Sequence, residues 1–231
     1  MTTLNRIAVR SRNDPGEIAL NDAIVRNILF TDCALSMTGC RTRSAFTECR
    51  FENIELRECA VGHPVFDRCE FSTVVSDDTT TLYDSLFLHC SFSGALRNFN
   101  FGNGYAGSPF FSEDRFREDL SAMERAAYCV DICEAQVEDC AFVGSTIAKK
   151  IRFRQGQAII LAGESLDVRL RPLLLSTNDE QLGALIAGAV AFGAEDELHF
   201  SVVPLGAEQK YAGFVEIIRN QGVEVIERPI C

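Results

Sequence analysis

Large apolar residues recur at every fifth position in the N-terminal half of the chain. In the clearest stretch they are Phe46, Phe51, Leu56, Val61, Phe66 and Phe71. The residue two positions before each is small or compact in most cases, with cysteine at positions 49, 59 and 69. A period of five fits neither an α-helix, which repeats every 3.6 residues, nor a β-strand, which alternates every two. It predicts a solenoid with four short sides, in which each five-residue unit makes one side and turns a corner.

Weaker copies of this pattern extend it in both directions. The further apolar positions are Val25, Phe30, Leu35, Leu82, Phe87, Phe92, Ile132, Val137, Phe142 and Ile147. Over roughly residues 23–147 the pattern resembles the pentapeptide-repeat family, whose members fold as a right-handed quadrilateral β-helix. The resemblance implies a mainly β fold with about four coils of such a β-helix. The segments that break the pattern predict a helical insertion in the β-helix and a small α/β module after it.

Two segments depart from the five-residue pattern. Residues 93–130 contain a Gly- and aromatic-rich loop, after which Ser112 caps a predicted helix that ends near Tyr128. From about residue 150 onward, apolar runs and helical stripes predict the order β-β-α-β-α-β, with a half-buried strand over Leu166–Leu170. We therefore predict a β-helix domain over residues 1–150, with its insertion at about 93–130, and an α/β module over 151–231.

The ten cysteines do not have the spacing of a metal site. No CxxC pair occurs, and His63, His89 and His199 lack zinc-finger spacing. Cys49 and Cys69 are instead one predicted coil apart, so they should stack on adjacent coils as buried, reduced thiols. The sequence therefore predicts no metal site.

The usual motifs of enzymes are absent from the sequence. It contains no GxxxxGK, GxGxxG, HExxH or GxSxG. Its one cluster of carboxylates with a histidine joins Glu195, Asp196 and Glu197 to His199, and an acidic loop entering a strand explains that cluster more simply. We therefore predict a protein with no catalytic residue and no cofactor. An enzyme with a site at the junction of the β-helix and the α/β module stays an alternative.

Hydropathy and charge limit where the protein acts and what it binds. No apolar run reaches the roughly 20 residues that span a bilayer, and the N-terminus lacks the apolar core of a secretion signal. We therefore predict a cytoplasmic protein that binds no membrane. The net charge of −11 disfavours direct binding to nucleic acid, which requires basic surface.

The acidic residues gather outside the clearest repeats. Residues 25–71 carry 7 acidic and 6 basic groups, whereas residues 72–150 carry 12 and 6. A rod that imitates DNA should carry its negative charge on the repeats themselves. We therefore favour a non-enzymatic protein-binding module, an inhibitor or toxin-immunity type protein of bacterial origin that acts through acidic surfaces. The residues predicted to bind the partner are Glu113, Asp114, Glu118, Asp119, Glu124, Asp131, Glu134, Glu138 and Asp139.

The predicted partner is a protein, either a toxin or an enzyme that acts on nucleic acid. The pentapeptide-repeat resemblance implies a second possibility, because some members of that family mimic DNA and bind DNA gyrase or another topoisomerase. It also implies that the chain could form a homodimer through its C-terminal segment.

Overall fold

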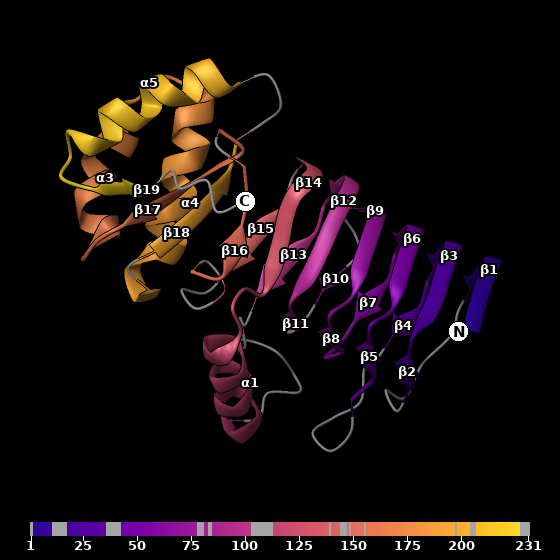
Figure 1. The fold of residues 1–231 in the computed structure, drawn as a ribbon. Helices are drawn as coiled ribbons and strands as arrows, with labels where there is room; N and C mark the ends of the chain where they lie inside the picture. Colours follow the sequence, from indigo (N-terminus) through magenta and orange to yellow (C-terminus); the bar gives the residue numbers. More distant parts are fainter. Residues whose placement is uncertain are drawn as a thin grey trace.

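The computed structural model places parallel strands in the first part of the chain and helices packed on a mixed sheet in the second (Figure 1). It describes residues 2–10, 18–35, 43–77, 81–82, 85–102, 113–138, 140–143, 147, 149–154, 156–196, 198–203 and 207–226.

Seven parallel strands form the longest sheet, in the order β1-β3-β6-β9-β12-β14-β16. They lie side by side in chain order, starting from the N-terminus (Figure 1). Their bounds are β1 (Thr2–Arg10), β3 (Ala23–Thr31), β6 (Arg50–Arg57), β9 (Glu70–Ser76), β12 (Cys90–Arg97), β14 (Val130–Glu138) and β16 (Ile151–Arg152).

Two shorter parallel sheets alternate with this sheet along the chain, in the orders β10-β7-β4 and β11-β8-β5-β2. The first comprises β4 (Ala34–Leu35), β7 (Ala60–Val61) and β10 (Thr81–Leu82), and the second β2 (Ala19–Asn21), β5 (Ala45–Thr47), β8 (Val65–Asp67) and β11 (Leu86–Leu88). Each sheet adds one strand for every circuit of the chain, so the next circuit always supplies the neighbouring strand.

Left-handed backbone at non-glycine residues explains the five-residue period. Glu48, Asn53 and Glu58 are five residues apart and have φ of 54°, 55° and 52°. Corresponding residues of other circuits have the same conformation; they include Asp22, Asn27, Asp32, Arg68, Thr73, His89 and Asn98. A left-handed residue interrupts regular extended backbone; the strand ends beside it at Glu48 and Glu58, whereas β6 continues through Asn53. One such residue in every five sets the spacing of the inward-facing apolar side chains.

The prediction of a mainly β, closed quadrilateral β-helix is wrong. The described residues form a mixed α/β structure, with three parallel sheets, a mixed five-stranded sheet and four helices. Successive five-residue units do not each make a separate side. In β6 the pairing with β9 continues on both sides of Asn53, from Arg50 to Leu56, so two units share one long strand.

Two glycine substitutions should have opposite effects, because Gly94 has left-handed backbone whereas Gly213 lies inside a helix. Gly94 in β12 has φ of +67°, and a Cβ there would lie 2.5 Å from Thr73 Oγ1. We expect Gly94→Ala to lower the free energy of unfolding by about 1–2 kcal/mol. Gly213→Ala, in the helix α5 (Glu208–Arg219), should raise it by about 0.5–1 kcal/mol because the added methyl meets open space. Urea unfolding measures both, and a destabilising effect of Gly213→Ala or a neutral Gly94→Ala would contradict this account.

Two ladders of stacked phenylalanine rings fill the space between the parallel sheets. They consist of Phe46, Phe66 and Phe87, and of Phe51, Phe71 and Phe92. Successive centroids within a ladder are 4.6–5.1 Å apart, close to the spacing of neighbouring strands. Rings of different ladders meet at steep angles, as between Phe46 and Phe51 at 79°. This edge-to-face contact is favoured for aromatic pairs.

Cysteines stack in the same interior, as their spacing predicts. Cys49, Cys69 and Cys90 lie on adjacent circuits, and each is at most 1% exposed. Burial raises the pKa of the Cys49 and Cys90 thiols, whereas a hydrogen bond from Cys90 lowers the pKa of Cys69. All three are free thiols, whereas Cys133 is disulfide-bonded and does not belong to this set.

Cys129 makes stability depend on pH in the alkaline range. The side chain is fully buried, and burial raises its pKa from 9.0 to about 12. The unfolded chain therefore loses this proton first, and the free energy of unfolding falls as pH rises from 9 to 12. We expect this decline to be steeper in the wild type than in Cys129→Ala, by up to about 1.4 kcal/mol per pH unit. Urea unfolding at several pH values tests this, and parallel declines in the two proteins would contradict it.

A five-stranded sheet in the order β13-β15-β18-β17-β19 links the two parts of the chain. Its strands are β13 (Asn100–Gly102), β15 (Ala141–Val143), β17 (Ala158–Ala162), β18 (Leu198–Val202) and β19 (Glu224–Ile226). β15 pairs with β18 in antiparallel orientation, through Phe142 and Phe200. Strands from both sides of residue 150 therefore share one sheet, and the domain boundary there stays a prediction.

Three helices pack on this sheet: α3 (Leu166–Ser176), α4 (Glu180–Asp196) and α5. The strand predicted over Leu166–Leu170 is wrong, because α3 occupies that segment. Leu166 and Leu170 are fully buried, whereas Val168 between them is 65% exposed. The buried residues are thus four apart, as on one face of a helix, and the observed order after residue 150 is β-β-α-α-β-α-β.

The helix predicted in the insertion is confirmed as α1 (Glu113–Arg125). Lys150 Nζ donates hydrogen bonds of 3.0 and 2.8 Å to the backbone oxygens of Glu124 and Ala126, at the C-terminal end of α1. A positive charge is favourable at this end of a helix.

Among the described residues, no helix is long and apolar enough to cross a membrane.

Candidate functional site

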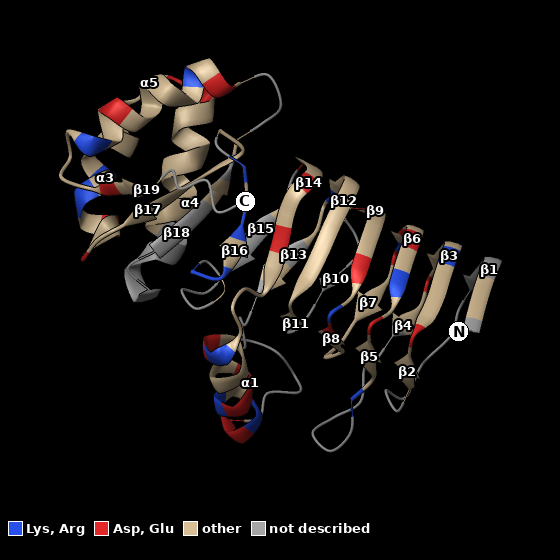
Figure 2. Ribbon diagram, in the orientation of Figure 1, with Lys and Arg blue, Asp and Glu red and all other residues tan. Residues whose placement is uncertain are grey.

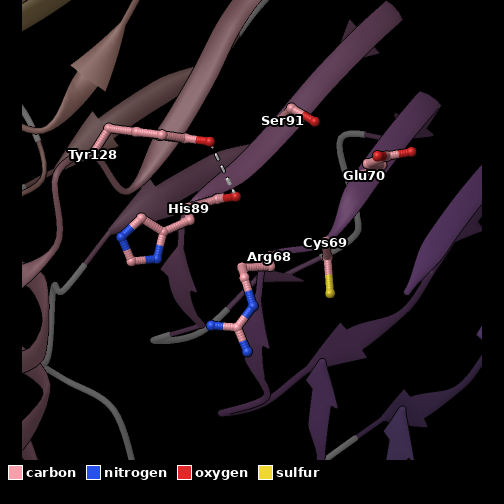
Figure 3. A pocket seen from close by; sticks show the side chains of 6 residues that line it. All are labelled: Arg68, Cys69, Glu70, His89, Ser91 and Tyr128. Atoms are coloured by element: carbon pink, nitrogen blue, oxygen red, sulfur yellow. Dashed lines mark hydrogen bonds between the residues drawn. The ribbon is translucent and has the colours of Figure 1, made fainter. Parts of the chain in front are cut away.

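A shallow depression lies on the outside of the parallel stack, where β9, β12 and β14 begin (Figure 3). It has a volume of about 450 Å³ and is lined by Arg68, Cys69, Glu70, His89, Ser91 and Tyr128. Ser91 lies in register between Glu70 on β9 and Asp131 on β14. Its side chain is much shorter than those on either side, which leaves the surface hollow at this point. We call this feature the Ser91 depression.

One side of the Ser91 depression is a ridge of residues that precede successive strands. Glu48, Arg68 and His89 all have left-handed backbone, at φ of 51–54°. The backbone N–H of Arg68 donates to the oxygen of Leu88, and that of His89 donates to the oxygen of Tyr128. Each circuit therefore places one large polar side chain directly beside that of the previous circuit.

Arg68 is held by two carboxylates. Its Nε lies 3.1 Å from Glu48 Oε1, and its Nη2 lies 3.0 Å from Asp67 Oδ2. His89 approaches the same aspartate, with 3.6 Å between Nδ1 and Asp67 Oδ1. This distance is too long for a hydrogen bond. The Arg68 guanidinium is thus fixed, while Asp67 Oδ1 has room for a further donor.

Tyr128 lies between a histidine and an arginine. The His89 ring meets it edge-on at 5.5 Å, and the Arg152 guanidinium lies 5.0 Å from its ring centroid. The Tyr128 hydroxyl donates to the backbone oxygen of His89 at 3.5 Å (Figure 3). Arg152 is itself fixed by Asp131, at 3.1 Å. These contacts hold a half-buried aromatic side chain in one position at the surface.

The acidic residues predicted on α1 fall into two groups. Glu113, Asp114, Glu118 and Glu124 are exposed, and basic side chains lie among them on the helix (Figure 2). Asp119 is buried, and both of its carboxylate oxygens accept hydrogen bonds from Arg43, one at 3.0 Å. Asp119 therefore holds α1 against the strands and adds nothing to an exposed acidic surface.

One of the acidic residues predicted on β14 lies next to the Ser91 depression, because Asp131 is in register with Ser91. Asp131 borders it and accepts a hydrogen bond from the backbone N–H of Cys133 at 3.0 Å, in addition to the pair with Arg152. Glu134 and Glu138 are exposed, and Glu138 pairs with Arg97 at 2.7 Å. Asp139 lies outside the described residues. A partner-binding role for these nine acidic residues stays a prediction.

Sequence reasoning did not identify Arg68, His89 and Tyr128 as site residues. The signal for the first two lies in the repeat itself, since Arg68 and His89 each directly precede the cysteine of their unit. Tyr128 also precedes a cysteine, Cys129, but the insertion with α1 separates it from the clear part of the pattern. One side chain from each circuit thus converges on the same ridge.

Opposite charges alternate on the outer face of the long sheet (Figure 2). Arg50 pairs with Glu70 at 3.0 Å, and Arg26 pairs with Glu52 at 3.4 Å. A continuous negative surface, as on duplex DNA, does not form across these strands, and the DNA-mimicking alternative stays a prediction. So does the enzyme alternative, because Glu197 and the side chain of His199 lie outside what the structure describes.

The described residues thus define a repeat protein of stacked parallel strands, joined to a helical α/β part and carrying a surface depression with one aromatic residue in its lining. No known family model matches the sequence, and no curated protein matches it. Among solved structures the chain is similar to QnrB1, a plasmid-mediated fluoroquinolone resistance protein. The two share 10% identity over 66% of this chain and 80% of that chain, with a TM-score of 0.22. A similarity at this level carries no conclusion about fold or function, so the pentapeptide-repeat resemblance stays one of sequence pattern.

Proposed function

We propose that this chain is a non-enzymatic protein-binding module whose contact surface is centred on the Ser91 depression. The observation that carries the proposal is that Tyr128 and Arg68 line one surface hollow, with Arg152 packed against the Tyr128 ring. Tyrosine and arginine are enriched among the residues that dominate binding energy at protein interfaces. Here they are fixed by neighbouring side chains before any partner arrives, so little conformational entropy is lost on binding.

The surroundings of the Ser91 depression match the usual anatomy of an interface. The ring of Tyr128 forms part of its lining, and the charged pairs Arg50–Glu70 and Arg152–Asp131 lie beside it. The supporting strands are paired on both sides, which gives the surface a rigid base. A partner with a complementary surface would therefore bind a preformed site.

Charge favours a basic partner, as expected for an inhibitor or immunity protein with a toxin or nucleic-acid-acting target. The chain carries a net charge of −11, and the exposed acids of α1 and β14 come from the elements on either side of Tyr128 in the sequence. Such acids steer a positively charged protein toward the surface and raise its association rate.

Affinity capture from extracts of the native cell tests this function. The baits are the wild type, Tyr128→Ala and, as a control, Arg171→Ala, which removes an exposed arginine from an ion pair on α3. We expect one discrete protein on the wild-type and control baits, retained at least about tenfold less by Tyr128→Ala. Circular dichroism confirms that all three baits are folded. Equal retention by the three baits, or no discrete partner, would contradict the proposal.

A further inference from the structure

Charges at the Ser91 depression and its rim do not balance. Glu70 and Arg68 line the depression, and five further charged groups pair with them or lie beside them. Together they make four carboxylates and three guanidinium groups: Glu48, Asp67, Glu70 and Asp131, and Arg50, Arg68 and Arg152. Arg50 and Arg152 each have one carboxylate partner among these groups, whereas Arg68 is shared between Glu48 and Asp67. One negative charge is therefore left over on the Arg68 side.

The surplus carboxylate has room for a new hydrogen bond. Asp67 Oδ2 is bound by Arg68, whereas Oδ1 lies 3.6 Å from His89 Nδ1, beyond hydrogen-bond distance. Glu70, which lines the depression, has an exposed side chain and pairs with Arg50 through Oε2. Two carboxylates thus have acceptor capacity left near the same hollow.

An anionic side chain from a partner would meet the opposite situation. Arg68 already pairs through Nε with Glu48 and through Nη2 with Asp67, so its single positive charge is compensated before a carboxylate enters. It would also add to the surplus negative charge. The charges at the depression therefore disfavour an acidic occupant.

Tyr128 adds a second preference for a cation. The chain's own Arg152 lies over this ring, 5.0 Å from its centroid, so the ring already makes one contact with a cation. Aromatic faces attract cations, and a guanidinium also matches a carboxylate with two parallel hydrogen bonds. We infer that the Ser91 depression receives an arginine or lysine side chain of the partner, bound by Asp67 and Glu70 beside Tyr128. This inference rests on the proposed function, whose protein partner supplies the side chain.

Small probes test the inference without the partner. The ¹⁵N-labelled protein is titrated at low ionic strength and followed by NMR. One probe is N-acetylarginine amide, and the matched acidic probe is N-acetylglutamate amide, which keeps its side-chain carboxylate. We expect saturable shifts of the backbone amides of residues 68–70, 89–91 and 128 with the arginine probe, and none with the glutamate probe. Asp67→Asn and Glu70→Gln should each weaken arginine binding about three- to fivefold.

Glu55→Gln is the matched control, because Glu55 is an acid on β6 that pairs with Arg57 away from the depression. It should leave arginine binding unchanged. The inference is overturned by an absence of saturable shifts, by equal binding of the glutamate probe, or by equal effects of all three substitutions. These outcomes leave the affinity capture with Tyr128→Ala unaffected, so the two proposals fail separately.

Discussion

Replacing Asp119 with alanine lowers the free energy of unfolding by about 3–5 kcal/mol. Asp119 is 3% exposed, and both of its carboxylate oxygens bind the Arg43 guanidinium, which is itself largely buried. The substitution leaves that positive charge in the interior without its partner. Because Asp119 belongs to the inserted helix and Arg43 lies just before β5, the loss should also loosen α1 from the strands. Urea unfolding followed by circular dichroism gives the change.

Two further variants separate the buried pair from an ordinary surface charge. Glu113→Ala removes an acid of the same helix whose pair with Arg117 is about two-thirds exposed, and it should cost less than about 0.5 kcal/mol. The double variant Arg43→Met with Asp119→Leu removes both buried charges and should recover most of the lost stability. If Asp119→Ala costs no more than Glu113→Ala, the description of a buried pair is wrong.

Phe92→Ala should destabilise the protein by a similar amount, about 3–5 kcal/mol. The ring is 2% exposed and stacks on Phe71 at 4.6 Å. It also meets Phe87 and Phe101, with centroids 5.8 and 5.1 Å away. Truncation at this point leaves a cavity lined by rings that the stacked strands hold in place, so the space does not collapse.

The other end of the ladders provides the comparison. Phe46 is only partly buried, so Phe46→Ala should cost clearly less than Phe92→Ala in the same urea unfolding experiment. Phe92→Leu, which keeps most of the volume, should cost less than about half as much as Phe92→Ala. Equal losses for Phe46→Ala and Phe92→Ala would show that the core does not deepen toward β12.

Local features of the fold could be predicted from the sequence. The five-residue spacing identified the inward-facing phenylalanines, the buried cysteines and the interruption that contains α1. These depend on backbone geometry that repeats every five residues and on side-chain burial, both of which leave a direct pattern in the residues. The arrangement of the sheets leaves no such pattern. The sequence around Asn53 is compatible both with two units on separate sides and with two units in one long strand.

The segment at residues 166–170 shows a second limit. Leu166, Val168 and Leu170 alternate with charged residues, as in a half-buried strand, yet the two leucines are also four apart, as on one helix face. Only the packing of α3 against β17 and the neighbouring helices decides between the two periods, because it buries both leucines and leaves Val168 exposed.

The candidate site depends on pairing between circuits, which a count of charges along the chain does not show. Sequence reasoning selected acidic residues by their density and therefore included Asp119, whose charge is used inside the protein. It missed Arg68, His89 and Tyr128, which are far apart in the sequence and come together only because each precedes a neighbouring strand. Their convergence requires the register of the parallel strands, and the insertion before Tyr128 conceals that register in the sequence.

Site-specific photocrosslinking in the native cell tests the central claim most directly. A photoreactive amino acid is placed at Ser91, in the depression, and separately at Glu216, an exposed residue of α5. The account predicts one discrete protein adduct from position 91 that is absent from position 216 and is lost when Tyr128→Ala is added. The same adducts from both positions, or none from position 91, would contradict a protein-binding role for the Ser91 depression.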